Sequence, residues 1–162
     1  MIQSFPPVFS PECSVLILGS MPSPVSLQKG QYYGHERNHF WALMADVLQQ
    51  PMPQEYEKRT QTLLLCGVGL WDVIRSCERQ GALDRDIRNE QPNDIADLIE
   101  HSRVQLLAFN GTKAQSVYER HIVLPRAVDT LLLPSSSPIP RRHIKSLQDK
   151  LPMWRKIRDY LV

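Results

Sequence analysis

The chain lacks the features that mark several classes of protein. Its three cysteines, Cys13, Cys66 and Cys77, are far apart and in no CxxC pattern, so no disulfide framework, zinc knuckle or four-cysteine iron–sulfur site is expected. No apolar run approaches the length of a membrane span. The first residues, MIQSFPPVFSPE, lack the basic start and continuous apolar stretch of a signal peptide. We therefore expect a cytoplasmic protein without membrane contact, or a nuclear one where the source has a nucleus.

Net charge is also small, at +2 over 162 residues, and the composition is that of an ordinary globular protein. A mass of 18.7 kDa suits one domain over residues 1–162, with a proper core. The positive charges gather near the C-terminus, where they outnumber Asp149 and Asp159. On charge alone, this basic end fits a polyanion-binding surface and a solvated helix face equally well. Its seven basic residues are Arg141, Arg142, Lys145, Lys150, Arg155, Lys156 and Arg158.

Apolar runs alternate with helical patterns along the chain. Buried strands are predicted at 15–19, 104–109 and 130–134, with a further short strand inside 62–74. Helical periodicity begins near Phe40, after Asn93 or Asp94, after a cap at Thr112, and around Trp154, where Pro152 is tolerable only near the first turn. The polar region 75–92 is expected to be irregular. This order predicts an α/β fold, a three-layer α/β/α sandwich with a central, mainly parallel four-stranded sheet.

Ligands of such folds bind outside the carboxyl ends of the strands. Three loops follow predicted strands there, GSMPSPVS, NGTK and PSSSPIPRR, and each is small and polar or rich in proline. The third offers three serine hydroxyls and a stiff apolar tip, which suits a phosphodiester and a flat surface behind it. A simple surface turn is the commoner role of such a segment. The relevant residues are Ser135, Ser136, Ser137, Pro138, Ile139, Arg141 and Arg142.

The other two loops are open to more than one interpretation. Asn110 and Gly111 face a ligand in one interpretation and form only a turn before a helix cap in the other, which the composition favours. GSMPS matches no nucleophile elbow, P-loop or dinucleotide motif, although Ser20 is a conceivable nucleophile. Asp72 is either a catalytic carboxylate or a residue that caps a turn, and the second is favoured.

The segment YYGHERNHFWALM carries more polar and aromatic groups than a helix start requires. Asn38 is a plausible N-cap for a helix beginning at His39. Tyr32 and Tyr33 precede that helix, so its own apolar face cannot bury them. An aromatic ring in a loop at this end of the sheet suits stacking on a planar ligand such as a nucleobase.

Several of these motifs, taken in order, resemble the uracil-DNA glycosylase superfamily. GSMPSPVSLQKGQYYGHERNHFW is similar to its first motif, and LPSSSPIP is similar to the PS-rich loop that pinches the DNA backbone and wedges into the gap. LGSMP, YYGHERNHFW, GLWDVI, FNGTKA and LPSSSP are closer still to the hypoxanthine-DNA (DNA-deoxyinosine) glycosylase branch. The resemblance runs from about Val15 to the last helix.

The resemblance implies a role for each matching residue. Asn38 matches the catalytic asparagine of the hypoxanthine branch, and Tyr33 matches the aromatic that stacks on the everted base. Asn110 and Gly111 match the turn lining the base pocket, to which Ser20, Met21 and His35 are also assigned. The serine loop, with Pro138, Ile139, Arg141 and Arg142, is expected to grip the DNA backbone and supply the wedge.

Met21 stands where the uracil/thymine branch has an asparagine that positions water. Because a methionine cannot orient water, we expect Asn38 to carry that task. The resemblance thus implies a monomeric, monofunctional hydrolase of N-glycosidic bonds, acting without a metal or cofactor on DNA that contains a deaminated base. Hypoxanthine is the favoured base and uracil the second.

Two other classes of function remain open on the sequence. One is a phosphoester or acyl hydrolase that uses Ser20 or Ser135, with His35 or His143 as the base. The other is a module that binds damaged DNA without chemistry, since Met21 removes a familiar catalytic group.

Overall fold

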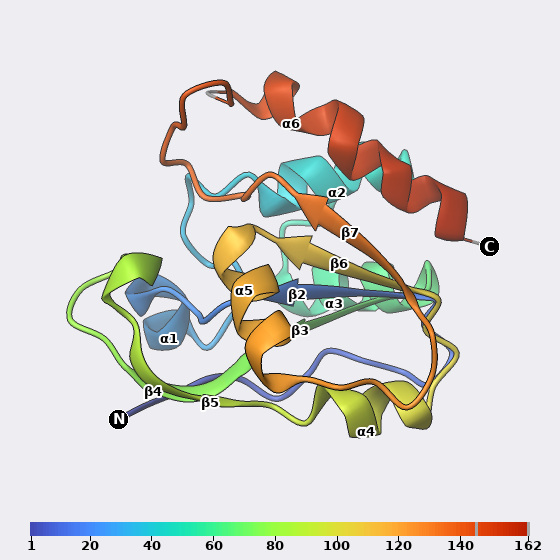
Figure 1. Cartoon of the computed structure of the whole chain (residues 1–162). Coiled ribbons are helices and arrows are strands. Elements are labelled where there is room, and N and C mark those ends of the chain that lie inside the picture. Colours follow the sequence, from blue (N-terminus) through green and yellow to red (C-terminus); the bar gives the residue numbers. More distant parts are fainter. Residues whose placement is uncertain (145, 162) are drawn as a thin grey trace.

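The protein is described by a computed structural model, which covers residues 1–144 and 146–161. Its centre is a parallel four-stranded sheet in the order β3-β2-β6-β7 (Figure 1). The strands are β2 (Val15–Gly19), β3 (Val68–Asp72), β6 (Leu106–Asn110) and β7 (Asp129–Leu133). The predicted fold class and all four predicted strands of this sheet are therefore confirmed.

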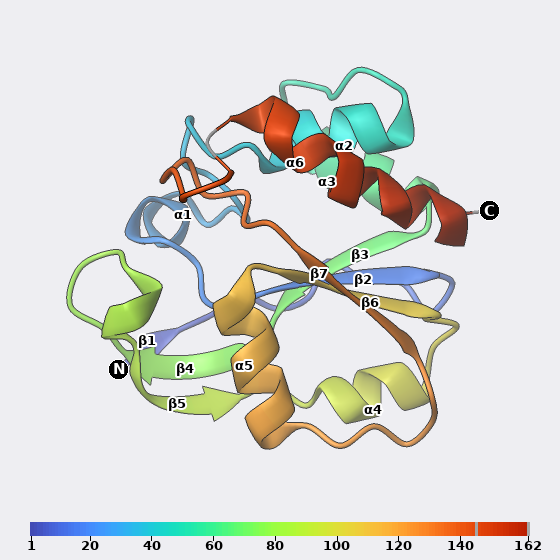
Figure 2. The same cartoon turned by 45° about the horizontal axis from the view of Figure 1, so that its top comes forward.

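Helices cover both faces of this sheet (Figures 1 and 2). Because side chains alternate along a strand, Val15 and Ile17 of β2 point into one core, while Leu16 and Leu18 point into the other. The first core lies under α2 (Phe40–Leu48), α3 (Tyr56–Leu65), α6 (Leu147–Trp154) and the 3₁₀ helix η2 (Arg155–Tyr160). The second lies under α4 (Ile95–Glu100) and α5 (Thr112–His121).

A second, antiparallel sheet was not predicted. It has the order β1-β4-β5 and contains β1 (Ile2–Gln3), β4 (Ile74–Glu78) and β5 (Arg88–Pro92). The expectation that 75–92 is irregular is therefore wrong. The segment β5, RNEQP, is polar and largely exposed, so it has no apolar alternation to reveal it, and β4 is interrupted by register shifts. The short 3₁₀ helix η1 (Asp84–Asp86) connects β4 to β5.

Several predicted helix starts differ in detail. Asn38 does accept a hydrogen bond from the Phe40 amide at 2.9 Å, but α2 begins at Phe40 and His39 occupies the N-cap position. Thr112 is the first residue of α5 and caps nothing, because Gly111 is the N-cap with a φ of 97°. Asp94 caps α4 as expected.

Two further differences concern prolines. The segment after β2 contains an unpredicted short helix, α1 (Pro24–Lys29), which starts at a proline behind the cap residue Ser23. Pro152 lies inside α6 beyond its first turn, and η2 follows directly after that helix. Among the described helices, none is both long and apolar enough to cross a membrane.

Candidate base-binding site

The loops at the carboxyl ends of the sheet are joined through Ser136. Its amide donates to Asn110 Oδ1 at 2.8 Å, and Asn110 Nδ2 donates back to Ser136 Oγ at 2.9 Å. Its carbonyl accepts from the His39 amide at 2.9 Å. The serine loop (134–140), the turn after β6 and the start of α2 are thus held in one unit, and Ser136 itself is 1% exposed.

A buried lysine fixes the next residue of the serine loop. Lys150 of α6, which is 3% exposed, donates to the Ser137 carbonyl at 2.9 Å and lies 3.0 Å from His39 Nδ1. Burial and then the Lys150 charge lower the pKa of His39, so its Nδ1 carries a lone pair that accepts from the ammonium group. Nearby, Trp154 Nε1 donates to the Pro134 carbonyl at 2.9 Å. Helix α6 therefore holds the loop at its first residue, Pro134, and near its middle, at Ser137.

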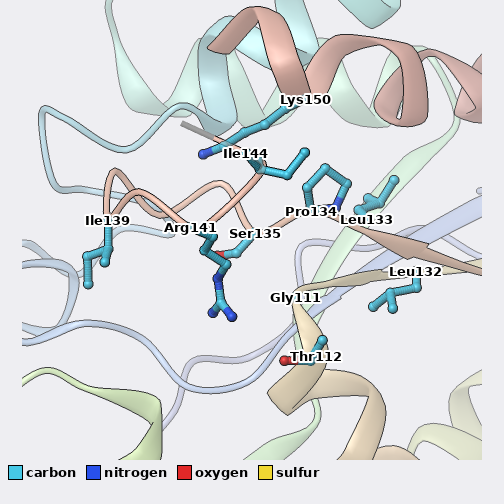
Figure 3. A pocket seen from close by; sticks show the side chains of 10 residues that line it. All are labelled: Gly111, Thr112, Leu132, Leu133, Pro134, Ser135, Ile139, Arg141, Ile144 and Lys150. Carbon is cyan, nitrogen blue, oxygen red and sulfur yellow. The ribbon is translucent and has the colours of Figure 1, made fainter. Parts of the chain in front are cut away.

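A cavity of about 200 Å³ lies between the serine loop, the start of α5 and α6. Figure 3 shows Arg141 pointing toward Gly111 and Thr112, with the Lys150 amino group on the opposite side. Gly111 is close to the loop, since a Cβ on it would lie 3.3 Å from Ser135 Cβ. Neither Tyr33 nor Asn38 lines this cavity, so it adjoins the loops without containing the predicted catalytic amide.

Tyr33 lies outside this cavity, beside Phe40 of α2. Its ring stacks on Phe40 with centroids 4.0 Å apart, and its φ of 53° is unusual for an aromatic residue. The preceding Tyr32 holds this conformation, because its hydroxyl donates to the Pro6 carbonyl and its amide donates to the Tyr56 hydroxyl. Burial and then the charge of Asp72 raise the pKa of Tyr33, which the Asn110 side chain partly offsets.

A buried carboxyl group, that of Asp72, lies near the Tyr33 hydroxyl. Asp72, the last residue of β3, is 3% exposed, and burial followed by the charge of Asp84 raises its pKa to about 7. Among the described residues, no group donates a hydrogen bond to its Oδ2, so Asp72 does not cap a turn through that oxygen. A Cβ on Gly19 would lie 2.6 Å from Asp72 Oδ1 and 3.1 Å from the Tyr33 hydroxyl.

The remaining predicted site residues make contacts of their own. Ser20 Oγ donates to Asp84 Oδ1 at 2.8 Å, Met21 is 8% exposed in the second core, and His35 Nδ1 accepts from the Arg37 amide in its own turn. Pro138 and Ile139 are exposed at the loop tip and Arg141 and Arg142 just after it, and Ile139 and Arg141 also line the cavity. In the described part of the chain no histidine bonds to Ser20 or to Ser135. The Ser135 hydroxyl accepts instead from the Ser137 amide. The alternative of a serine-dependent hydrolase therefore has no supporting geometry.

The predicted basic end does not form one surface. Lys150 is buried under the serine loop, while Arg155 and Arg158 bond to Asp46 of α2. Lys145 lies outside the described residues. The exposed cations beside the site are thus Arg141 and Arg142 at the loop tip.

Sequence reasoning missed Lys150, His39 and the close approach at Gly19. Lys150 carried one signal: it falls on the buried stripe of its helix, three residues after Leu147 and four before Trp154. The pairing of β2 with β3 brings Gly19 opposite Asp72 and could not be read from spacing alone.

The fold and these contacts define an α/β protein with a polar site at the carboxyl ends of its strands, the usual place for an enzyme's active site in such folds. A family model of the uracil DNA glycosylase superfamily matches residues 6–161. The chain belongs to this superfamily, and it is a hydrolase of N-glycosyl bonds of the DNA glycosylase kind.

Named relatives agree with this assignment. The chain is 38% identical over 146 residues to a hypoxanthine DNA glycosylase of Methanosarcina barkeri, covering 89% of this chain and 91% of the relative. It is 37% identical over 150 residues to the hypoxanthine DNA glycosylase of Methanosarcina acetivorans, covering 91% and 94%. A solution NMR structure from M. acetivorans, described as a candidate uracil DNA glycosylase, has a TM-score of 0.78 and 34% identity, covering 96% of this chain and 97% of that one.

Proposed function

We propose that the protein removes hypoxanthine from DNA by hydrolysing the N-glycosidic bond of deoxyinosine after the nucleotide is everted. The names of relatives 37% and 38% identical support hypoxanthine, with uracil as the second candidate. The observation that carries the proposal is the set of contacts made by Ser136. Through them the serine loop, the turn at Asn110 and the start of α2, directly after Asn38, form one site.

Asn38 is the proposed catalytic residue. Its Oδ1 accepts from the Phe40 amide at 2.9 Å, which fixes the side chain at the mouth of α2. Among the described residues, its Nδ2 has no hydrogen-bond partner, so this group is left to donate to the departing base or to water. Breaking an N-glycosidic bond leaves the electron pair on the base, and a fixed donor stabilises the charge that develops there.

Tyr33 and the serine loop would hold the substrate. One face of the Tyr33 ring is covered by Phe40, so the everted base would stack on the opposite face. The cavity bordered by Ser135 and Arg141 offers a hydroxyl and a cationic group to the sugar-phosphate backbone. Ile139, which is 58% exposed at the loop tip, would enter the gap in the duplex.

A panel of duplexes tests this function. Each carries one hypoxanthine, uracil, xanthine or G·T mismatch, and abasic sites are scored at enzyme in excess of DNA. We expect abasic sites chiefly in the inosine duplex. Binding to that duplex without any abasic product would instead favour a non-catalytic module that recognises damaged DNA.

Two variants isolate the Asn38 amide. Asn38→Ala should lower the single-turnover rate by about a hundredfold or more while leaving DNA binding largely intact, since a preorganised donor contributes roughly 3–4 kcal/mol. Asn38→Asp is the matched control for folding, because a carboxylate oxygen of aspartate can accept the same hydrogen bond from the Phe40 amide. It should keep the thermal stability of the protein and still lose base release. A wild-type rate in either variant rejects the catalytic role.

A further inference from the structure

A second cavity, of about 420 Å³, opens to solvent on the face of the central sheet that carries α4. Its walls come from three segments: residues 7–11 ahead of β2, the end of β3, and α4. Figures 1 and 2 show α4 and α6 on opposite faces of the sheet, so this cavity, the α4 pocket, lies away from the helix that supports the serine loop. Its apolar wall consists of Pro7, Phe9, Pro11, Trp71 and Leu98.

Backbone pairing fixes much of this apolar wall. Val8 exchanges two hydrogen bonds with Leu70 of β3, at 2.9 Å and 2.8 Å, so its segment runs along the edge of the central sheet. Because side chains alternate along an extended chain, Phe9 and the prolines on either side of it share one side of the segment. Phe9 also lies close to β3, since a Cβ on Gly69 would be 2.7 Å from its Cδ1 atom. The wall is therefore formed before any ligand binds.

Carboxylates give the α4 pocket a negative charge. Asp94 and Asp97 line it and are both exposed, while no Lys or Arg in the described part of the chain lines it. His101 lies 3.4 Å from Asp97 Oδ1, and a Glu100 carboxylate oxygen is within 4.8 Å of both side chains. Three carboxylates thus accompany at most one cationic imidazole. The pocket is negative although the chain has a net charge of +2.

The α4 pocket differs in charge from the cavity beside the serine loop. Arg141 and Lys150 line that cavity, and the two sites have no residue in common. Arg141 attracts DNA phosphates, whereas the carboxylates of the α4 pocket repel them. A ligand of the α4 pocket must therefore carry positive charge, and it can bind while the serine loop holds DNA.

Positive charge is not sufficient, because most of the wall is apolar. A small cation would pair with the carboxylates and leave the Phe9 and Trp71 rings in water. An uncharged apolar group would cover the rings and remove water from the carboxylates without replacing its hydrogen bonds. A peptide segment that carries a Lys or Arg residue beside apolar residues satisfies both requirements, and its cation can also lie over an aromatic ring.

We propose that the α4 pocket is the docking site of a protein partner, which binds through a short extended segment with Lys or Arg next to Leu, Pro or an aromatic residue. The side chains of this segment contact the wall formed by residues 7–11 and Trp71, and its cation pairs with Asp97 at the rim. The partner binds the glycosylase and its DNA at the same time, because it uses none of the residues of the serine loop.

Three sets of short, capped, fluorescent peptides test the chemistry of the site. The first has Arg among Leu and Pro residues, the second has Glu in place of Arg, and the third has Arg among Ser residues. Binding to the full chain is measured by fluorescence anisotropy at about 0.15 M salt. We expect the first set to bind at least about tenfold more tightly than either of the others, since each of those lacks one of the two contacts.

Variants of Asp97 locate the binding site. Asp97→Asn should weaken binding of the first set by about fivefold, and Asp97→Lys by about thirtyfold or more. Both keep the backbone amide that donates to Asp94 Oδ1, so α4 retains its cap, and thermal unfolding checks this. Glu57→Lys is the matched control for Asp97→Lys, because Glu57 is an exposed carboxylate of α3 on the other face of the sheet. DNA affinity and base release should equal those of the wild type in both Asp97 variants.

Four outcomes would overturn the proposal. Equal weakening by Asp97→Lys and Glu57→Lys would mean that only net charge matters. Arginine amide that binds as tightly as the first peptide set would make the pocket a site for small cations. Self-association of the wild type in analytical ultracentrifugation, lost in Asp97→Lys, would identify the occupant as a second copy of this chain. Displacement of the peptide by a DNA duplex would place the pocket on the DNA-binding surface. None of these results depends on which base is released, so this proposal and the proposed function fail separately.

Discussion

Two groups of polar side chains meet at the carboxyl end of the sheet, and they differ in how completely their hydrogen bonds are satisfied. In the serine-loop group, Asn110 and Ser136 bond to each other twice, and Lys150 bonds to the Ser137 carbonyl. In the Gly19 group, Asp72 Oδ2 is buried without a partner among the described residues, and the Tyr33 hydroxyl, which lies near Asn110, forms no well-aligned hydrogen bond with them. The two groups adjoin, since Asn110 acts on the pKa of Tyr33.

This difference indicates that the two groups have different roles. A fully satisfied buried network fixes one conformation, because any rearrangement leaves a group unpaired. The serine-loop group therefore suits a rigid support for DNA. The Gly19 group retains hydrogen-bonding capacity that the fold does not use, which suits contact with a base that arrives and leaves. Substitutions in the Gly19 group should thus change the rate of base release. Substitutions in the serine-loop group should change the affinity for DNA.

The largest effect is expected at Gly19. In Gly19→Ala, the new Cβ would meet Asp72 Oδ1 at 2.6 Å, a distance at which something must move. The carboxyl and the phenol would be displaced, so we expect the single-turnover rate of base release to fall by about a hundredfold or more, the size of a lost transition-state contact. Affinity for the duplex, measured by fluorescence anisotropy, should change little because the serine loop is untouched.

Gly81→Ala is the control for a general glycine effect. Gly81 has a φ of 84° and no atom within 4 Å of an ideal Cβ, so alanine there is strained but not crowded. It should cost about 1 kcal/mol of unfolding free energy and leave base release unchanged. A Gly19→Ala protein that releases hypoxanthine at the wild-type rate would show that the space beside Asp72 is not used.

A smaller effect, on binding instead of rate, is expected at Lys150. Lys150→Met keeps the apolar stem but removes the bonds to the Ser137 carbonyl and to His39. The serine loop loses a support, and we expect about tenfold weaker DNA binding with a single-turnover rate near that of the wild type at saturating enzyme. Lys156→Met, an exposed change in η2 with the same loss of charge, is the control. Equal weakening in both variants would mean that only net charge matters.

Much of the architecture was predictable because local hydrophobic patterns in the sequence indicate its strands and helices. The strands β2 and β6 are largely apolar runs buried on both faces, and the α2 stripe from Phe40 to Leu48 follows helical spacing. The segment 88–92 was not predictable, since an exposed polar strand has the composition of a loop and is defined only by its partner β4.

The candidate site was also predictable only in part. The loops were predictable, because parallel strands bring their carboxyl ends to one edge. The pairing of Asp72 with Gly19, and of Lys150 with His39 across 111 residues of sequence, depends on sheet register and on how α6 crosses α2. Tertiary packing decides these contacts, so spacing along the chain contains no signal for them.

The smallest effect is expected at Asp46, which forms ion pairs with two arginines of the basic C-terminal segment. Arg155 and Arg158 bond to Asp46, and the hydrogen bond from Arg155 is the main reason that the pKa of Asp46 is lowered. A lowered pKa means that the charged carboxylate contributes stability above its unfolded pKa, and that this contribution is lost as pH falls through the folded value. Asp46→Asn should therefore cost about 1 kcal/mol or less near neutral pH, and the gap to wild type should close in acid. Urea unfolding across pH measures this gap. Because η2, which carries Arg155 and Arg158, directly follows the helix α6 that carries Lys150, base release at saturating enzyme serves as a second readout and should not change. A lower rate in this variant would show that the ion pairs of Asp46 influence the Gly19 group. The proposed division between a group that supports DNA and a group that contacts the base would then be wrong.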